Sequence, residues 1–334
     1  MTRKIYIILR GRRSKLPEVD GYVEALEELG ENVSVITSDT YETLRYFKRL
    51  KFYLNVNREL TSNNSVSIVW VIWQPMSFIL PLLNKISLKK LGKFQFVMDV
   101  RTKADSNGLK AQLKDILTKF EACFFDKIVL INKNISFLVG QRKFFELPMG
   151  VSRDFLEGPK YEYAENLRIS YFGTINKDRG IDIGLNLLAD LPIVDSITVA
   201  SFNSFSMTAS RVPFTHLGVI ERAYVPDSLR DNNINACVSL IAPTSAVFIQ
   251  APTKVIEALA LGYACVVNET PGLYNLNIDH SKRAPLDEIY PAIKCHPTWH
   301  KLDKFFGEIY LYYPHDLKHL TWTSHFKGLM GKIL

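Results

Sequence analysis

The sequence lacks several motifs that would assign it directly to a common class of enzyme. Its 334 residues include 17 glycines, yet no Gly-x-Gly-x-x-Gly, Gly-x4-Gly-Lys-Ser/Thr or Gly-x-Ser-x-Gly occurs. These motifs bind dinucleotides, surround nucleotide phosphates and present a nucleophilic serine, respectively. Their absence argues against a dinucleotide oxidoreductase, a P-loop nucleotide hydrolase and an α/β-hydrolase.

Cysteine and histidine are also too sparse to suggest a metal site or a disulfide framework. The four cysteines form no Cys-x-x-Cys pair, and all seven histidines follow residue 215. Separate thiols are typical of a reducing compartment, so we expect a cytoplasmic protein. No Asp-x-Asp pattern falls in a suitable loop either, and we expect neither a bound metal nor a cofactor.

No apolar run approaches the roughly 18 residues that a membrane-spanning helix needs. The chain is 47% hydrophobic and 22% charged, which is typical of a globular protein. Its length favours two domains at about 100–200 residues per domain.

Positive charge is concentrated in the first part of the chain. Residues 1–150 contain 24 Lys and Arg against 15 Asp and Glu, a net charge of +9, whereas the remainder carries −2. This asymmetry suggests an anionic partner for the first part. A phosphorylated acceptor, an anionic membrane and nucleic acid all satisfy it, although no nucleic-acid-binding module is recognisable.

Short β-branched runs alternate with helical patterns, which predicts an α/β fold with parallel sheets. The predicted strands are 5–9, 33–38, 67–73, 94–100, 127–131, 168–172, 196–200, 216–219, 236–240 and 263–267. We predict two Rossmann-like domains facing a cleft, at 1–150 and 167–314. A linker at 151–166 joins them, and a C-terminal helix at 315–334 is expected to cross back to the first domain.

Residues 171–182 combine a strand end, two glycines and two cations. Gly173 would end the strand, and Gly180 would open the next helix. Glycine allows the backbone to approach an anion closely, and a helix N-terminus offers free N–H groups to phosphate. Lys177 and Arg179 would add positive charge. An ordinary loop with surface cations would give the same pattern.

Residues 251–262 predict a helix whose N-terminus is suited to a ligand. Pro252 fits the first helical position and Gly262 the position after the end. Lys254 and Glu257 are three residues apart and share one edge of this helix. The carboxylate of Glu257 can accept two hydrogen bonds from the vicinal hydroxyls of a ribose, and Lys254 would lie near its phosphates. A surface Lys–Glu pair is the alternative interpretation.

Together, Phe-Gly…Lys-x-Arg-Gly and Pro-Thr-Lys-x-x-Glu-x-Leu-Ala-x-Gly, about 75 residues apart, resemble the C-terminal half of GT-B glycosyltransferases. The resemblance is greatest to the large family 4 group, which mostly retains anomeric configuration. Segments 130–151, 216–220 followed by 225–229, and 320–325 agree with that family in order. The resemblance covers most of residues 127–334 and rests on the α/β pattern alone before them.

The resemblance implies roles for particular residues in binding a nucleotide-sugar donor. Glu257 would bind the ribose, and Arg179 or Lys177 would neutralise the pyrophosphate and act in catalysis. The remaining donor-side candidates are Gly173, Thr174, Gly218, Val219, Gln250, Thr253 and Lys254, with Gly218 and Val219 under the base. The sequence departs from the family at Ile249, where a first glutamate is expected, and at Thr174, where arginine often occurs.

The first domain should receive the acceptor. Gly11 and Arg12 follow the first strand, Gln74 follows the third, and Asp99 and Arg101 end the fourth. Asp99 is the catalytic candidate on this side, although a structural salt bridge with Arg101 explains the pair equally well. Stretches 41–55 and 76–91 are basic and contain aromatic or apolar residues, which suits an anionic membrane surface.

These features favour a glycosyltransferase, hexosyltransferase-like and metal-independent, that moves a sugar from a nucleotide-sugar onto a glycan or lipid-linked acceptor in surface-polysaccharide assembly. Its expected location is the cytoplasm, at the inner face of the membrane. A nucleotide-sugar epimerase of the same fold is the first rival, but the first half has no histidine for its chemistry. A nucleic-acid-binding protein without enzymatic activity is the second.

Overall fold

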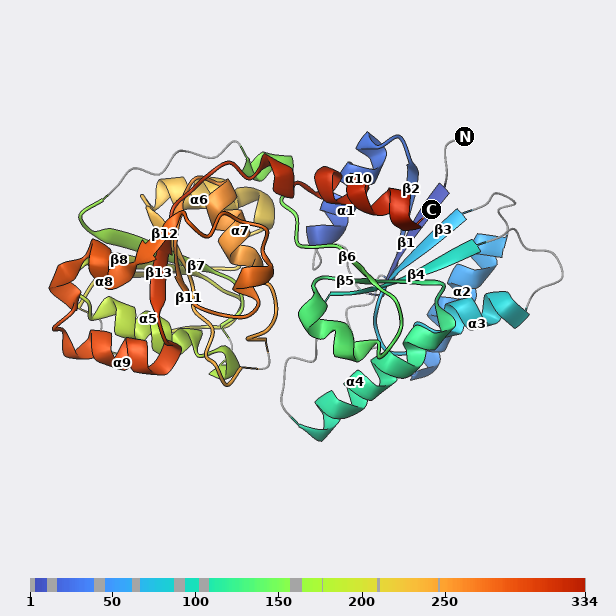
Figure 1. Ribbon diagram of the computed structural model, residues 1–334, viewed down its shortest axis with the longest axis horizontal. Helices are drawn as coiled ribbons and strands as arrows, with labels where there is room; N and C mark the ends of the chain where they lie inside the picture. Colours follow the sequence, from blue (N-terminus) through green and yellow to red (C-terminus); the bar gives the residue numbers. More distant parts are fainter. Residues whose placement is uncertain are drawn as a thin grey trace. The chain divides into compact units, whose positions relative to one another are not determined.

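The computed structural model describes residues 4–10, 17–38, 46–61, 67–86, 94–101, 108–156, 164–175, 177–208, 211–245 and 247–333. The chain divides into two compact units (Figure 1). The first contains Met1–Gly150 together with Trp322–Leu334, and the second contains Val151–Thr321.

The first unit is built on a six-stranded parallel sheet in the order β2-β1-β3-β4-β5-β6. Its strands are β1 (Lys4–Leu9), β2 (Asn32–Thr37), β3 (Ser67–Ile72), β4 (Phe94–Val100), β5 (Lys127–Leu130) and β6 (Phe145–Glu146). Its helices are α1 (Pro17–Glu28), α2 (Tyr46–Thr61), α3 (Ile79–Ile86), α4 (Leu109–Glu121) and α10 (Trp322–Ile333). Every residue of β3 is buried, as expected where helices cover both faces of a sheet.

The second unit is built on a seven-stranded sheet in the order β12-β13-β11-β10-β7-β8-β9. Its strands are β7 (Leu167–Phe172), β8 (Val194–Ala200), β9 (Phe214–Gly218), β10 (Ala236–Ser239), β11 (Ala264–Asn268), β12 (Arg283–Pro285) and β13 (Ile309–Tyr312). Its helices are α5 (Ile181–Ala189), α6 (Val225–Asp231), α7 (Thr253–Ala260), α8 (Leu286–Ile289) and α9 (Pro297–Phe306). Figure 1 shows α5 and α9 on one face of this sheet and α6 and α7 on the other.

The predicted class, two α/β domains with parallel sheets, is confirmed, with one addition. β13 pairs antiparallel with both β11 and β12 at one edge of the second sheet. Residues Lys133–Leu138 form a 3-10 turn. The predicted linker at 151–166 lies partly outside the described residues, which resume at 164.

The predicted C-terminal helix begins at Trp322 rather than at 315. Asp316 accepts a hydrogen bond from the amide of Lys318 at 2.9 Å, and a 3-10 turn follows at Lys318–Leu320. An aspartate that binds the backbone two residues ahead favours a turn over a helix. Val151 forms a bridge with Thr321, so this segment belongs to the second unit and the helix to the first.

Trp322 anchors α10 in the first unit by filling space left by two glycines. A Cβ on Gly21 would lie 2.1 Å from Cδ1 of Trp322, and one on Gly150 would lie 2.6 Å from Cδ2. The ring of Tyr22 meets Trp322 edge-on, with centroids 4.9 Å apart. Glycine at positions 21 and 150 is therefore required for this close packing.

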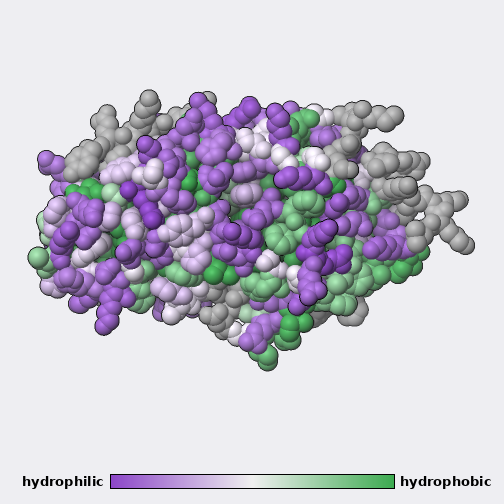
Figure 2. Space-filling view, in the orientation of Figure 1, coloured by the Kyte–Doolittle hydropathy of each residue, from purple (hydrophilic) through white to green (hydrophobic). Residues whose placement is uncertain are grey.

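Polar side chains cover much of the face drawn in Figure 2, and hydrophobic ones gather around α3 and α4. No helix in the described part of the chain combines the length and the apolar character needed to span a membrane.

We expect Trp322→Ala to lower the free energy of unfolding of the first unit by about 3–5 kcal/mol, because a fully buried indole leaves a cavity. The exposed Lys327 on the same helix provides the control, and Lys327→Ala should change the value by less than about 0.5 kcal/mol. Urea denaturation followed by circular dichroism measures both. Equal midpoints for the two variants would contradict the anchoring role of Trp322.

Candidate functional site

The candidate site lies at the carboxyl edge of the second sheet, which is where open α/β sheets bind ligands. β7 ends at Phe172, and Gly173 follows with φ +143. The amide of Gly173 donates to the carbonyl of Ala200 at 2.9 Å. Gly180, with φ +70, then precedes α5, so both glycines occupy backbone conformations that other residues rarely adopt.

The structure brings the two sequence signals together at Gly173. A Cβ on this residue would lie 2.4 Å from Cε and 2.7 Å from Nζ of Lys254. Lys254 belongs to the first turn of α7, so its side chain reaches the β7 loop only because position 173 has no side chain. Its ammonium also lies 6.0 Å from the ring centroid of Tyr171.

Lys254 is held among other charges. Burial lowers its pKa, and the nearby cations Arg179 and Arg222 lower it further, whereas Glu257 raises it. A buried ammonium is stable only when opposite charge or hydrogen bonds compensate it. With three cations around one carboxylate, the cluster has an excess of positive charge that a bound anion would balance.

Of the two predicted phosphate-binding cations, the structure places Arg179 in this cluster. Arg179 is half-buried and Lys177 is exposed. Burial raises the pKa of Tyr171 to about 12, and a hydrogen bond and the charge of Arg179 oppose that shift. Tyr171 in turn donates its hydroxyl to the carbonyl of Thr174 at 3.0 Å, which fixes the loop.

Glu257 is paired with Arg222 rather than Lys254. Nη2 of Arg222 lies 2.9 Å from Oε1 of Glu257, and both side chains are about a quarter exposed. The guanidinium also lies 4.8 Å from the ring centroid of Phe155. Arg222 is a site residue that the sequence analysis missed, because it lies in no motif and only folding brings it to α7.

Several hydrogen-bond donors of the site are buried without an acceptor among the described residues. They are Nε of Arg179, Nε of Arg222 and Nε2 of Gln250. Buried donors normally have partners, so donors without one in a cationic cluster suit a ligand rich in acceptor oxygens. Phosphate and carboxylate groups have that chemistry.

Two helices begin at this edge, and the described residues provide no side-chain cap for either. Gly180 precedes α5 and Pro252 precedes α7, whose first residue is Thr253. Their free backbone N–H groups favour an anion. Gly218 ends β9 with φ +70 and Val219 is exposed, so the turn predicted to lie under the base is accessible.

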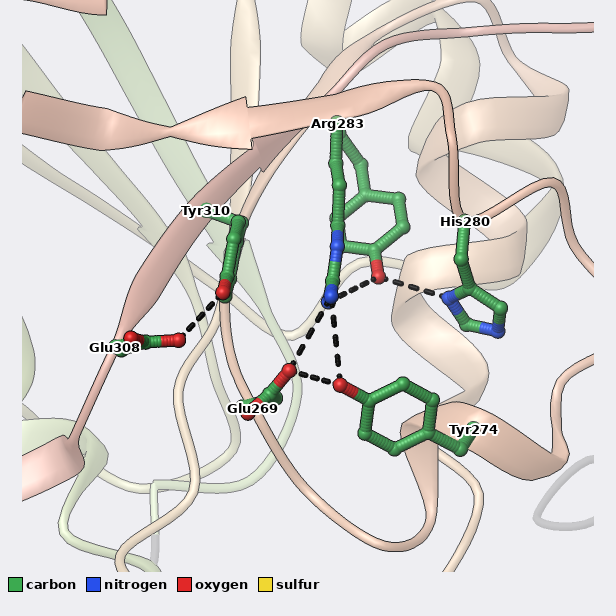
Figure 3. A network of polar contacts seen from close by, with 7 residues as sticks. Glu269, Tyr274, His280, Arg283, Glu308 and Tyr310 are labelled. Atoms are coloured by element: carbon green, nitrogen blue, oxygen red, sulfur yellow. Dashed lines mark hydrogen bonds and ion pairs between the residues drawn. The ribbon is translucent and has the colours of Figure 1, made fainter. Parts of the chain in front are cut away.

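A second polar network stabilises the antiparallel edge of the same sheet (Figure 3). Arg283 of β12 pairs with Glu269 at 3.2 Å and donates to the hydroxyl of Tyr312 at 3.0 Å. Its guanidinium stacks on Tyr310, 4.0 Å from the ring centroid. His280 contacts the same Tyr312 hydroxyl at 2.9 Å.

This network fixes a turn that supports the start of α7. Glu269 directly follows β11 and precedes the turn that contains Gly272. A Cβ on Gly272 would lie 1.8 Å from the carbonyl oxygen of Gln250. The turn therefore packs on the backbone that leads into α7, and Arg283 holds it there through Glu269.

In the first unit, Asp99 and Arg101 form the structural salt bridge that was the alternative interpretation. Asp99 has no exposed surface and accepts hydrogen bonds from Tyr22 and Trp70, each at 2.9 Å. Its other oxygen lies 3.6 Å from Nη1 of Arg101. The structure therefore favours the salt bridge, since a polar residue at a strand end can also face the core, and a catalytic role for Asp99 stays a prediction.

Arg101 is equally enclosed, so it does not present its charge to an acceptor. It donates to the carbonyl of Leu147 at 3.0 Å and lies 5.5 Å from the rings of both Tyr22 and Trp322. Gln74 is half-buried in the loop after β3, and its acceptor role stays a prediction. Gly11 and Arg12 lie outside the described residues. Within the described ranges, no three His, Cys, Asp or Glu side chains are grouped to hold a metal ion.

No family model and no curated protein matches the sequence. Solved structures match it in fold. A Listeria monocytogenes protein, assigned provisionally as a UDP-N-acetylglucosamine 2-epimerase, is 13% identical over 80% of each chain, with a TM-score of 0.50. Another UDP-N-acetylglucosamine 2-epimerase is 9% identical over 99% of this chain and 97% of its own, also at 0.50.

The calicheamicin glycosyltransferase CalG4 also matches, with 12% identity over 79% of each chain. Its TM-score is 0.40. The two structures at 0.50 share the two-domain GT-B fold with this chain, so the fold expected from the sequence resemblance is confirmed.

The two ion pairs predict stability losses of very different size. Asp99→Ala leaves Arg101 buried without its partner and should cost about 3–5 kcal/mol of unfolding free energy in the first unit. Glu257→Ala removes a partly exposed pair and should cost less than about 1 kcal/mol in the second unit. Urea titrations of the two variants measure the contrast. A large loss for Glu257→Ala would make its pair with Arg222 structural and would contradict a ligand role.

Proposed function

We propose that this protein is a glycosyltransferase that uses a nucleotide-sugar donor. The observation that supports the proposal most strongly is the half-buried cluster of Lys254, Arg179 and Arg222 beside Glu257, at the carboxyl edge of a sheet with the GT-B fold. A nucleoside diphosphate combines a dianionic or trianionic group with a ribose diol. The cluster offers cations for the first and a carboxylate for the second.

The charges of the site would act on the leaving group. As the glycosidic bond to the donor phosphate breaks, negative charge develops on the diphosphate oxygens. Preorganised cations and helix N-termini stabilise such charge without the need for a metal ion. Arg179, Lys254 and the starts of α5 and α7 would supply this stabilisation, and Gly173 allows the phosphate to approach the backbone.

Glu257 would bind the ribose while its second partner, Arg222, holds the carboxylate in place. A carboxylate has acceptor positions for both the guanidinium and a diol. The acceptor in this proposal is a glycan or a lipid-linked glycan in surface-polysaccharide assembly, and the transfer retains anomeric configuration, as the sequence resemblance implies. In that mechanism the leaving phosphate itself takes the proton of the acceptor hydroxyl. The protein would work in the cytoplasm at the inner face of the membrane.

A nucleotide-sugar epimerase is the second candidate, and the similarity in fold to two such enzymes favours it. The same donor site would serve both reactions, so nucleotide binding does not distinguish them. An epimerase changes the sugar of the donor with no acceptor present, whereas a transferase needs the acceptor. The described carboxylates of the first unit that are most deeply buried, Asp99 and Glu121, are both occupied by hydrogen bonds, which counts against the epimerase.

Incubation of the protein with a panel of nucleotide-sugars tests the proposal directly. We expect one donor to raise the melting temperature and to remain chemically unchanged for as long as no acceptor is added, apart from slow hydrolysis. Nuclear magnetic resonance of the anomeric proton follows the sugar. Conversion of the bound sugar to its 2-epimer would replace the transferase with the epimerase, and the absence of any stabilising donor would exclude both.

Glu257→Ala should weaken donor binding by about 2–3 kcal/mol, because it removes charge-assisted hydrogen bonds to the ribose. This corresponds to about 30- to 150-fold in Kd, which isothermal titration calorimetry resolves. Asp227 provides a matched control, since it forms an exposed pair with Arg230 in the same unit. Asp227→Ala should bind the donor as the unchanged protein does. Equal affinity for both variants would remove Glu257 from the site.

Transfer should persist in EDTA, because the proposed mechanism places cationic side chains where other enzymes place a divalent ion. The measurement compares initial rates after dialysis against EDTA with rates after addition of manganese or magnesium. Loss of activity on chelation, with recovery on addition of manganese, would contradict the cationic mechanism.

A further inference from the structure

Helix α4 carries a continuous apolar stripe on its outer face. Leu109, Leu113, Ile116 and Phe120 have exposed fractions of 72%, 56%, 64% and 53%. At 100° per residue these four side chains lie within about 60° of one another around the helix axis. Single exposed apolar residues are common on protein surfaces, but an aligned row of four large ones marks an interaction surface.

The buried face of the same helix is the more polar one. Ala111, Thr118 and Glu121 are the buried residues of α4, so the usual orientation of an amphipathic helix is reversed. Glu121 accepts hydrogen bonds from Nε1 of Trp73 at 3.0 Å and from Oγ of Ser77 at 2.9 Å. The amide of Met76 donates to its other oxygen at 2.6 Å.

These three bonds fix the rotation of the helix. Burial raises the pKa of Glu121, and its hydrogen bonds to Met76, Ser77 and Trp73 lower it. If the helix turned its apolar stripe inward, the carboxyl of Glu121 would move away from its donors and all three hydrogen bonds would break. Each of these bonds stabilises a buried polar group. The stripe therefore faces outward because of the fold.

The stripe continues beyond α4 into an aromatic cluster. Phe120 lies 5.9 Å from Phe78 and 5.3 Å from Phe124, measured between ring centroids. Phe78 and Phe124 are themselves 5.1 Å apart. Figure 2 shows hydrophobic side chains on this face, with hydrophilic ones between them.

Lysines border the stripe on both sides. Lys110 and Lys119 are exposed and lie about 90° to either side of it around the helix axis. They belong to the part of the chain, residues 1–150, that carries a net charge of +9. An apolar stripe between lysines is the pattern of a helix that lies in the interface of an anionic bilayer.

We propose that the outer face of α4 is the surface by which this protein docks on an anionic lipid bilayer. The helix lies parallel to the membrane, with Leu113, Ile116 and Phe120 among the acyl chains and Lys110 and Lys119 at the headgroups. The charge favours lipid over a second copy of the chain, because two such faces would bring like charges together.

This assignment differs from the stretches that the sequence favoured for membrane contact. In 41–55, Tyr53 is only 1% exposed and belongs to the core, although Lys48 and Lys51 on the same helix are exposed. Of the cations in 76–91, Lys89 and Lys90 lie outside the described residues. The proposal identifies the surface for the membrane contact that the proposed function includes, and it can fail separately from that function, since lipid binding is measured with neither nucleotide nor acceptor.

Sedimentation of the full chain with vesicles tests the proposal. Vesicles of phosphatidylglycerol and phosphatidylcholine at low salt should carry the protein down, and vesicles of phosphatidylcholine alone should carry down much less. The double variant Leu113→Gln/Ile116→Gln should lower the partition coefficient about tenfold or more, since two apolar side chains no longer enter the bilayer. Glutamine favours helix as well as leucine does, and both sites are exposed, so the fold should persist.

Two further variants separate the contributions of charge and of general surface hydrophobicity. Lys110→Gln/Lys119→Gln should release the protein at lower salt, because each lysine near the surface adds electrostatic attraction. Phe202 is 82% exposed in the second unit, and Phe202→Gln should partition as the unchanged protein does.

Three outcomes would overturn the proposal. The first is no sedimentation of the unchanged protein at low salt, and the second is equal partition of the Leu113→Gln/Ile116→Gln variant. The third is a stable dimer in size-exclusion chromatography that this variant converts to a monomer without any lipid binding, which would assign the face to self-association. Circular dichroism confirms in each case that the variant is folded.

Discussion

The approach of Lys254 to Gly173 is the constraint on which the rest of the candidate site depends. Burial of the Lys254 ammonium costs hydration free energy that nearby groups must offset. The carboxylate of Glu257 and the aromatic face of Tyr171 provide that stabilisation. Because Arg179 and Arg222 also lie near this lysine, the cluster has more positive than negative charge. Such an arrangement is costly in an empty core and favourable beside a bound anion. The absence of one side chain at position 173 thus sets both the electrostatics and the accessibility of the site.

The site also needs a rigid support, and the antiparallel edge of the second sheet provides it. Arg283 contacts a carboxylate and three tyrosine rings, so its position is fixed by stacking as well as by charge. Through Glu269 it holds the turn that packs against the backbone of Gln250. Binding residues that are supported in this way lose little conformational freedom when a ligand arrives, which increases affinity. The two clusters are therefore connected through this turn, although one has an excess of positive charge and the other pairs its guanidinium with a carboxylate.

The sequence predicted most strands of the two sheets because each is a short apolar run bounded by turn residues, and such runs are needed where both faces are covered. It failed at β6, which has only two residues, at β12, where Arg283-Ala284-Pro285 is short and polar, and at β13 and α9. The glycines and Lys254 were identifiable as site candidates from the sequence because they lie in two short motifs, at 171–182 and 251–262. Arg222 was not, because its meaning depends on Glu257, which lies on another helix. Asp99 and Arg101 show the opposite case, because a polar pair at a strand end can form a buried ion pair as readily as it can contact a ligand.

Helix α4 illustrates a limit that applies to any amphipathic pattern. The spacing of Leu109, Leu113, Ile116 and Phe120 identifies an apolar face of the helix. The spacing alone does not say whether that face points toward the core or toward solvent, and an apolar face usually points toward the core. Only the contacts of Glu121 reveal that the helix is turned the other way. This orientation also gives a reason for the uneven charge of the chain. The proposed donor site is built from residues 151–321, so the excess of lysine and arginine in residues 1–150 would not be needed for phosphate binding there. The excess positive charge lies instead in the unit that carries the outward apolar stripe of α4. An anionic membrane surface would interact with both the charge and the stripe.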